Sequence, residues 1–275
     1  MYDQSECQLE KTPAMNRSCL RFVFTLMSLL VLAPATFAQT RIAAAGDLEW
    51  VMAEVAHRFE ESTRNRMEVT YGSSGNFFQQ LENGAPFDLF FSANVDYPRR
   101  LEQEGLAESG SLYEYAKGKL VIWVRNSSSL DVDQGIELLL TDSVKKIAIA
   151  NPQHAPYGQA AVAAMKNKGM YDQVHSKLVL GENVAQALSF VVSGSADVGL
   201  VALSLALSPS VRDKGRFAEI SRADYPPIRQ ACIILKSSKN KEIARQYLEF
   251  MKTPAISALS RDYGFDVPDR SAPNR

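Results

Sequence analysis

The sequence predicts an α/β fold in which mostly parallel sheets are flanked by helices. Short apolar stretches of strand length alternate with longer segments in which apolar residues recur at helical spacing. The runs 120–124 and 228–235 are apolar almost throughout, which is typical of strands buried on both faces. The order strand, small-residue turn, helix recurs along the chain. It places helix N-termini at the carboxyl ends of strands, where such sheets bind ligands.

The first half of the chain repeats this order of strand, turn and helix. Over 48–62 the apolar residues fall at helical spacing, and Asp47 stands where an N-cap is expected. Residues 67–70 are apolar and β-branched enough for a strand. The expected elements of this half are strands at 41–45, 67–70, 89–92 and 120–124, and helices at about 48–62, 77–81, 97–104 and 136–140.

The second half continues the alternation. The turn at 151–158 leads into an alanine-rich helix, and Asn183 stands at the expected N-cap of the next helix. Gly264, after Tyr263, is a stop signal for the last helix. The expected elements of this half are strands at 147–150, 178–180, 198–202 and 228–235, and helices at about 159–167, 184–193, 241–251 and 254–261.

The first residues have the pattern of an exported protein's leader. Basic residues after Met15 precede an apolar run at 22–32, and a small-residue cleavage site follows. A membrane anchor is the alternative, but the apolar run is too short to favour it. We expect a leader at 1–38, with the signal peptide proper at 15–38, and a periplasmic location. Whether Met1 or Met15 starts translation is left open.

Charge and side-chain chemistry argue against several classes of function. The formal net charge is -1, so no basic field points to a nucleic-acid partner. Of the 3 cysteines, Cys232 alone lies beyond the expected leader, in an apolar run, and we expect it in the core rather than as a reactive thiol. We expect His57, His154 and His175 at the surface or at caps, because they are too scattered for a zinc site. Neither a P-loop nor a nucleophile elbow occurs.

The turn at 71–78, Tyr-Gly-Ser-Ser-Gly-Asn-Phe-Phe, bears most directly on function. Backbone N–H groups at a helix start can bind an anion, and glycines let the backbone come close to a ligand. Ser74 can add a hydroxyl group. The alternative is an ordinary strand-to-helix turn with a serine cap.

The motif that follows, Asn-Gly-Ala-Pro-Phe-Asp-Leu-Phe-Phe-Ser-Ala at 83–93, sharpens this prediction. Together with 71–75 it resembles the periplasmic molybdate-binding proteins of ABC importers, the ModA family. In that family a serine-rich turn and a short helix precede the same motif. The segments 149–158, 181–184 and 263–265 are similar to later parts of the family pattern. The resemblance covers about residues 41 to 265.

This resemblance implies a two-lobed periplasmic binding protein fold of type II, with the ligand in the cleft. The first lobe is expected at 39–120 plus 229–275, and the second at 121–228. Two crossovers would connect the lobes. The strands 120–124 and 228–235 are candidates for the hinge.

The resemblance also implies a set of ligand-binding residues. The family holds a tetrahedral oxyanion with neutral donors, which suits a desolvated dianion whose oxygens all need hydrogen bonds. Ser74 matches a ligand serine, while Tyr157 and Val184 fall at backbone N–H donors of later helices. Asp47 stands where the family has a serine, and Ala202 where it has a tyrosine. The phenol of Tyr157 could replace that missing hydroxyl.

Asp47 departs most from the family pattern, because a carboxylate repels a dianion. One alternative is that it caps its own helix and offers the ligand only its N–H group. A second is that Arg229 neutralises it. A third is that Asp47 is protonated and donates a hydrogen bond.

The resemblance implies a binding protein, not an enzyme, that captures molybdate and tungstate by lobe closure and delivers them to the membrane permease of an ABC importer. Molybdenum or tungsten would enter only as the oxyanion. We expect a monomer without a cofactor. The alternatives are the same fold tuned to sulfate, phosphate or an organic acid, and a two-lobed enzyme such as a deaminase of tetrapyrrole synthesis. A sensor is a further alternative, although no helix-turn-helix segment accompanies it.

Overall fold

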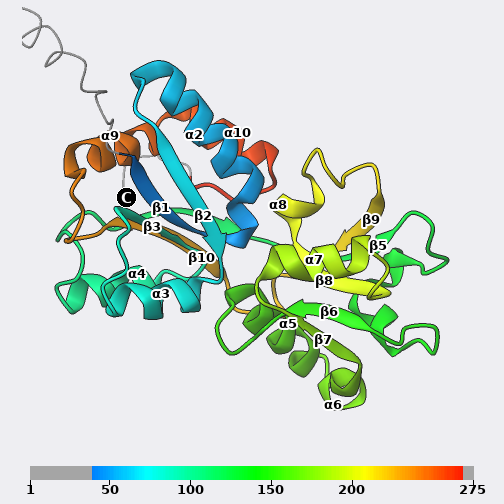
Figure 1. Ribbon diagram of the computed structural model, residues 1–275. Coiled ribbons are helices and arrows are strands. Elements are labelled where there is room, and N and C mark those ends of the chain that lie inside the picture. The colour runs from blue at the N-terminus through cyan, green and yellow to red at the C-terminus, as the bar shows by residue number, and fades with distance from the viewer. Residues whose placement is uncertain (1–38, 269–275) are drawn as a thin grey trace, which may run out of the picture. The chain divides into compact units, whose positions relative to one another are not determined.

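The computed structural model describes residues 39–268, so the expected leader at 1–38 lies outside the described part. Residues 39–268 form two five-stranded sheets (Figure 1). The first sheet has the order β2–β1–β3–β10–β4 and contains β1 (Thr40–Ala45), β2 (Met67–Gly72), β3 (Leu89–Ser92), β4 (Tyr113–Gly118) and β10 (Ile228–Ile234). The second has the order β7–β6–β8–β5–β9 and contains β5 (Leu120–Arg125), β6 (Ile147–Ala150), β7 (Leu178–Gly181), β8 (Val198–Ala202) and β9 (Gly215–Glu219).

Both sheets mix strand directions in the same way. In the first sheet β2, β1 and β3 run parallel, and β10 runs antiparallel to both β3 and β4. In the second, β7, β6 and β8 run parallel, and β5 runs antiparallel to β8 and β9. The expected α/β class is confirmed. Each parallel strand is followed by a helical segment, as βα crossovers require.

Helices cover both faces of the first sheet (Figure 1). Because side chains alternate along a strand, Phe90 packs with Phe78 on one face, whereas Phe91 faces Tyr247 on the other, with ring centroids 6.0 Å apart. Phe59 meets the same Tyr247 at 5.0 Å. The helices are α2 (Glu49–Thr63), α9 (Lys241–Met251) and α10 (Pro254–Asp262) on one face, and α3 (Ser74–Glu82) and α4 (Asp96–Gln103) on the other.

The second sheet is covered in the same manner, with α7 over β6 and β8 on one face and α5 on the other (Figure 1). Asn183 caps α7 as expected, because its side chain accepts hydrogen bonds from the backbone N–H groups of Ala185 and Gln186. The helical elements here are α5 (Pro156–Asn167), α6 (Tyr171–Val174), α7 (Val184–Val192), α8 (Leu203–Ala206), and the 3₁₀ segments η3 (Val132–Leu140) and η4 (His175–Lys177).

Several elements differ from the sequence-based expectation. The strands β4 and β9 and the short helices α6 and α8 were not expected. The expected helix at 136–140 is instead the 3₁₀ segment η3, which is kinked at Gly135, where φ is 62°. Cys232 is confirmed as a fully buried residue of β10. In the part of the chain that is described, no helix is both long and apolar enough to cross a bilayer.

Two links join the sheets, and both lie immediately before the strands that were expected to form the hinge. Lys119 separates β4 from β5, and Pro226-Pro227 precedes β10. The links lie near each other, since the backbone N–H of Leu120 donates to the hydroxyl of Tyr225 at 3.0 Å. We call the elements around the first sheet the first lobe and those around the second sheet the second lobe. The lobe bounds expected from the sequence remain a prediction.

Candidate functional site

Helix starts from both lobes surround one small cavity. Its walls come from the 3₁₀ turn η2 (Gly46–Leu48) and the start of α3 in the first lobe, and from the starts of α5 and α7 in the second. The four residues expected to bind the ligand, Asp47, Ser74, Tyr157 and Val184, all line it. The structure therefore brings together residues that lie far apart in the sequence.

The cavity is narrow. Its volume is about 10 Å³, which is room for about one water molecule. A tetrahedral oxyanion with four oxygens is larger than this. Since the walls belong to two lobes, separating the lobes is the direct way to widen the cavity.

Ser74 is the first residue of α3 and is 1% exposed. Its Oγ accepts a hydrogen bond from the backbone N–H of Ala93 at 3.0 Å. A hydroxyl has one proton to donate and two lone pairs that accept, so this contact leaves the proton of Ser74 available to a ligand. The N–H groups in the first turn of α3 also lack partners within the helix.

Ser73 joins the two lobes instead of capping α3. Its hydroxyl donates to the backbone carbonyl of His154 at 2.6 Å, and the N–H of Gly75 donates to the same carbonyl at 2.9 Å. The ring Nδ1 of His154 lies 2.8 Å from Ser73 Oγ, and since the single serine proton already goes to the carbonyl, Nδ1 is the donor. The serine-cap alternative is therefore wrong. His154 is also not a surface or cap residue, unlike the exposed His57 and His175.

Contact between the lobes is closest at Gly75. A Cβ atom added there would lie 2.5 Å from the carbonyl oxygen of His154, so only glycine fits this approach. One residue further on, the side-chain amide of Asn76 donates to Glu182 at 2.5 Å. We call these contacts, from Ser73 and Gly75 to His154 and from Asn76 to Glu182, the lobe latch.

Asp47 is 1% exposed and faces the protein interior. Its Oδ2 accepts hydrogen bonds from the hydroxyl of Tyr157 at 3.1 Å and from the side-chain amide of Gln230. Its backbone carbonyl accepts from Ser204 Oγ at 2.7 Å. The expectation that Asp47 caps its own helix is wrong, because neither η2 nor α2 has a side-chain cap. Asp47 lies within the 3₁₀ turn rather than before it, and its carboxylate is turned toward Gln230.

A buried polar network extends from Asp47 to the link between the lobes. Gln230 accepts from the hydroxyl of Tyr115 at 2.9 Å while its amide group donates to Asp47. The hydroxyl of Tyr157 lies beside Gly118, where an added Cβ atom would be 2.1 Å from it. The phenol of Tyr157 is thus occupied by Asp47, and Tyr157 has only its backbone N–H left to play the ligand role expected of it.

Burial dominates the electrostatics of this network. Burial raises the pKa of Asp47 from 3.8 to about 6, although the hydrogen bonds from Gln230 and Tyr157 act in the opposite direction. Burial, and then the charge of Asp47, raises the pKa of Tyr157 well above its usual range. Arg229 does not neutralise Asp47, because its guanidinium forms a two-pronged ion pair with Glu114, at 2.8 and 2.5 Å.

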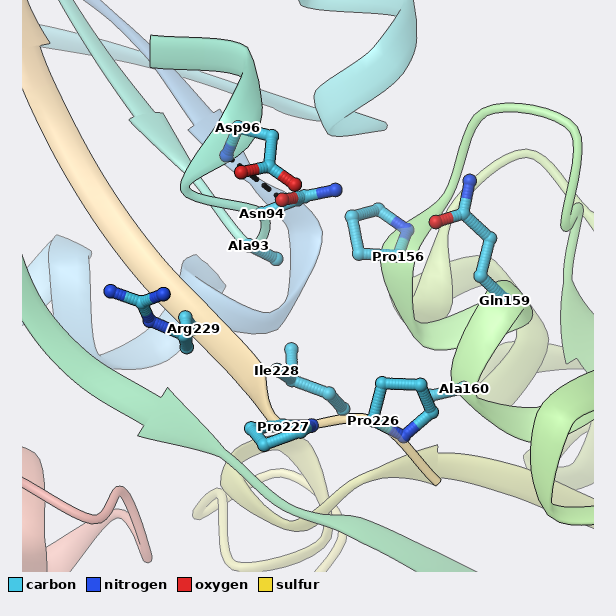
Figure 2. Close-up of a pocket in the computed structure, with 10 residues that line it drawn as sticks. All are labelled: Ala93, Asn94, Asp96, Pro156, Gln159, Ala160, Pro226, Pro227, Ile228 and Arg229. Atoms are coloured by element: carbon cyan, nitrogen blue, oxygen red, sulfur yellow. Dashed lines mark hydrogen bonds between the residues drawn. The ribbon is translucent and has the colours of Figure 1, made fainter. Parts of the chain in front are cut away.

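A wider pocket of about 190 Å³ lies next to the small cavity and shares Ala93 and Pro156 with it. Figure 2 shows this outer pocket between the start of α4, the start of α5 and the link that leads into β10. The backbone N–H of Asp96 donates to Asn94 Oδ1 at 2.9 Å, and the side chain of Arg229 points away from the pocket (Figure 2). Within residues 39–268, no group of three acidic, histidine or cysteine side chains is placed to hold a metal ion.

The sequence did not identify the second set of site residues. Gln230, Tyr115 and Ser204 come from elements far from Asp47 in the sequence, so no local motif connects them. Gln230 alone carried a signal, since it is a polar residue inside an apolar strand, and it is fully buried.

Comparison with known proteins places the chain in a family. It matches the model of the bacterial extracellular solute-binding proteins over residues 40–266. It is 36% identical over 253 residues to the molybdate-binding protein ModA of Azotobacter vinelandii, an alignment that covers 92% of this chain and 100% of that protein. This chain belongs to the ModA family of solute-binding proteins.

Further ModA proteins agree with this assignment. ModA of Rhodobacter capsulatus is 36% identical over 232 residues, covering 84% of this chain and 90% of that protein. The structure of the periplasmic molybdate-binding protein of Azotobacter vinelandii matches with a TM-score of 0.79 at 33% identity, covering 84% of this chain and 100% of that one. The two-lobed type II fold is thereby confirmed, and the relatives are solute-binding proteins rather than enzymes.

Proposed function

We propose that this protein is the periplasmic substrate-binding component of an ABC importer. It captures molybdate, and tungstate as well, by closing its two lobes over the anion, and delivers it to a membrane permease. One observation carries this proposal: helix starts from both lobes converge on a single cavity lined by Asp47, Ser74, Tyr157 and Val184. The relatives that are 36% identical to this chain are molybdate-binding proteins, which supports molybdate as the anion.

The donors around the cavity suit a small doubly charged oxyanion. The starts of α3, α5 and α7 carry partial positive charge. The first-turn N–H groups of Gly75, Ala185 and Gln186 are already used in contacts with His154 and Asn183. The backbone N–H groups of Tyr157 and Val184 are therefore the ones proposed to bind the anion. The hydroxyl of Ser74 adds a donor whose proton is available. These donors bind the anion's oxygens, and no side chain needs to ligate the metal atom. Fixed donors at fixed spacing also select for anion size.

Closure follows from where the lobes touch. The lobe latch holds Gly75 against the carbonyl of His154 on one side of the cavity. Within residues 39–268, the chain passes between the lobes at Lys119 and at Pro226-Pro227. We propose that these links act as the hinge between lobes at 39–120 plus 229–275 and at 121–228. Opening the latch would widen the cavity enough to admit the anion.

Isothermal titration calorimetry with molybdate, tungstate, sulfate and phosphate tests the proposal. We expect tight binding of molybdate and tungstate at one site and no heat from sulfate. Ser74→Ala should weaken binding, since it removes a hydroxyl donor to a charged ligand, while Ser189→Ala on the exposed face of α7 serves as the matched control. Binding of neither metal oxyanion by the purified protein would refute the proposal.

One observation supports hydrogen phosphate as an alternative ligand. Asp47 has a carboxylate oxygen, Oδ1, that is buried without a hydrogen-bond partner among the described residues. An ionised Asp47 could accept the proton of hydrogen phosphate, which neither molybdate nor sulfate carries at neutral pH. Tight phosphate binding with silent molybdate would therefore favour a phosphate receptor of the same fold.

A further inference from the structure

Asp47 introduces an acid into a cavity whose other donors are neutral. Its Oδ2 is already engaged by Tyr157 and Gln230. Its Oδ1 is buried and has no hydrogen-bond partner within residues 39–268. A buried polar atom without a partner is costly. Asp47 also lines the small cavity, and a ligand bound there could supply the missing partner.

The groups that surround Asp47 supply no positive charge to balance an ionised carboxylate. α5 contributes Tyr157, and the first sheet contributes Tyr115 and the neutral Gln230. The helices α7 and α8, which pack against η2, contain no charged residue. The nearest charge on α2 is the acidic Glu49 in its first turn, and β2 offers Tyr71 and Glu68.

Basic side chains on the neighbouring elements are paired elsewhere or, like Lys117 of β4, exposed to solvent. Arg229 of β10 pairs with Glu114, and Arg58 of α2 pairs with Glu54 at 2.7 Å. The ring of His154 contacts Ser73 in the lobe latch. A doubly charged anion in this cavity would therefore meet an uncompensated carboxylate if Asp47 remained ionised.

We propose that Asp47 binds the oxyanion as a neutral carboxylic acid, donating a hydrogen bond from Oδ1, so that each captured anion brings one proton into the site. This inference rests on the proposed function, since it concerns the same cavity. The proton comes from solvent, forms an O–H bond on Oδ1 and stays on Asp47 while it bonds to an anion oxygen. Oδ2 continues to accept from Tyr157 and Gln230.

The pH range of the effect follows from the buried position of the acid. Burial, offset in part by the hydrogen bonds from Gln230 and Tyr157, raises the pKa of Asp47 to about 6, and a dianion beside it raises the pKa further. Above pH 6, the ligand-free carboxyl group is mostly ionised and must take up a proton on binding. Below that pH it is already protonated and takes up little.

Calorimetry in two buffers of different ionisation enthalpy measures this proton directly. With molybdate at about pH 7.5, we expect uptake of about one proton per anion bound, falling toward zero as the pH approaches about 5. Over the range from about pH 6.5 to 8, the dissociation constant should rise about tenfold per pH unit. Tungstate should behave in the same way.

Three variants assign the proton to Asp47. Asp47→Asn and Asp47→Ser both carry a neutral donor, and we expect them to bind molybdate with proton uptake near zero and little dependence on pH. Asp96→Asn is the matched control, because Asp96 is an exposed acid on the outer pocket. It should keep the proton uptake of the wild type. If a variant folds poorly, the pH dependence of proton uptake and of the dissociation constant in the wild type still tests the inference.

Four different outcomes would overturn the inference. Tight molybdate binding without proton uptake at about pH 7.5 would mean that Asp47 stays ionised. Undiminished proton uptake in Asp47→Asn would place the proton on another group. Tight phosphate binding that Asp47→Asn abolishes would make Asp47 an acceptor. If the wild type binds neither molybdate nor tungstate, the proposed function itself fails together with this inference.

Discussion

Asp47 shows how one side chain can set both the stability and the chemistry of a site. Its carboxyl group is buried against Gln230 and Tyr157. Burial disfavours the ionised form of this carboxyl group. The hydrogen bonds to Oδ2 offset part of that cost. A neutral side chain of the same shape would avoid it, so the acid is retained at a penalty that a measurement of folding stability can detect.

The sign of that penalty follows from the raised pKa. The pKa of Asp47 is 3.8 before burial and about 6 after it, so between these values the folded state binds more protons than the unfolded state. Stability therefore falls as the pH rises through this window, by about 3 kcal/mol in all. Asp47→Asn removes the loss. We expect the variant to be more stable than the wild type above pH 6 and similar to it below about pH 4.

Urea denaturation of the ligand-free protein at about pH 4.5 and 7.5 checks this prediction. Asp172→Asn, an exposed acid on α6, provides the matched control and should leave the pH dependence unchanged. Equal stability of wild type and Asp47→Asn at both pH values would contradict a buried acid with a raised pKa.

For individual residues, the sequence predicted which side chains line the cavity but not what they contact. Ser74, Tyr157 and Val184 each follow a strand and stand at the start of a helix, and the resemblance to the ModA family indicated them as ligand-binding positions. The partner of Asp47 is Gln230, which reaches it only because β10 inserts beside β3. Such pairing depends on sheet order, which sequence spacing does not contain.

Among the elements, α7 combines a structural cap with the site. Asn183 accepts from two backbone N–H groups of α7 and also lines the cavity. A Cβ atom added at Gly46 of the other lobe would lie 3.0 Å from its side-chain oxygen. The cap of a second-lobe helix is therefore also part of the surface that faces the first lobe.

Two substitutions at Asn183 separate these roles. Asn183→Ala should cost about 1 kcal/mol of stability because the cap is lost. Asn183→Asp keeps an oxygen that can cap α7, so we expect it to fold with near wild-type stability. Its negative charge beside the cavity should nevertheless weaken molybdate binding. Melting curves measure the change in stability, and calorimetry measures the change in affinity. Unchanged molybdate affinity in Asn183→Asp would show that a charge at position 183 does not act on the bound anion.

The strands that the sequence did not predict have a common physical cause. β4 and β9 each lie at an edge of their sheet, and edge strands carry polar residues because one side of the strand meets solvent. β9 has no fully buried residue. Neither strand has the apolar run that identified β5 and β10, so their place in the fold depends on the partners they pair with.

In the molecule as a whole, the two lobes meet through backbone atoms at Gly75. Gly75→Ala would place a methyl group against the carbonyl of His154 and should hold the lobes apart. We expect molybdate affinity to fall roughly tenfold or more, while stability stays near that of the wild type, since alanine favours a helix. Gln80→Ala on the exposed side of the same helix is the control.

Small-angle X-ray scattering completes this test. The wild type should contract when molybdate is added, and Gly75→Ala should not. Contraction of the variant to wild-type dimensions, with unchanged affinity, would mean that the lobe latch does not limit closure.

The latch also allows closure to be controlled chemically. Asn76 and Glu182 touch across the lobes, with 2.5 Å between Nδ2 and Oε1, and cysteines at both positions can be joined by a short bifunctional reagent. Cross-linking before molybdate is added should block binding, and cross-linking afterwards should slow release. Either single cysteine should have no such effect, and Cys232 is too deeply buried to react. Normal exchange of ligand in the cross-linked protein would show that access does not require the lobes to part.

The position of β10 has a consequence for how the chain becomes a folded protein. β10 lies between β3 and β4, yet it is made only after the whole second lobe. A chain that emerges from its N-terminal end therefore cannot complete its first sheet until nearly all of its length is available. The second lobe has no such constraint, because its strands are contiguous in the sequence. Such distant pairing makes folding slow. In pulse-labelled hydrogen exchange the amides of β3, β4 and β10 should become protected together, after those of β6 and β8.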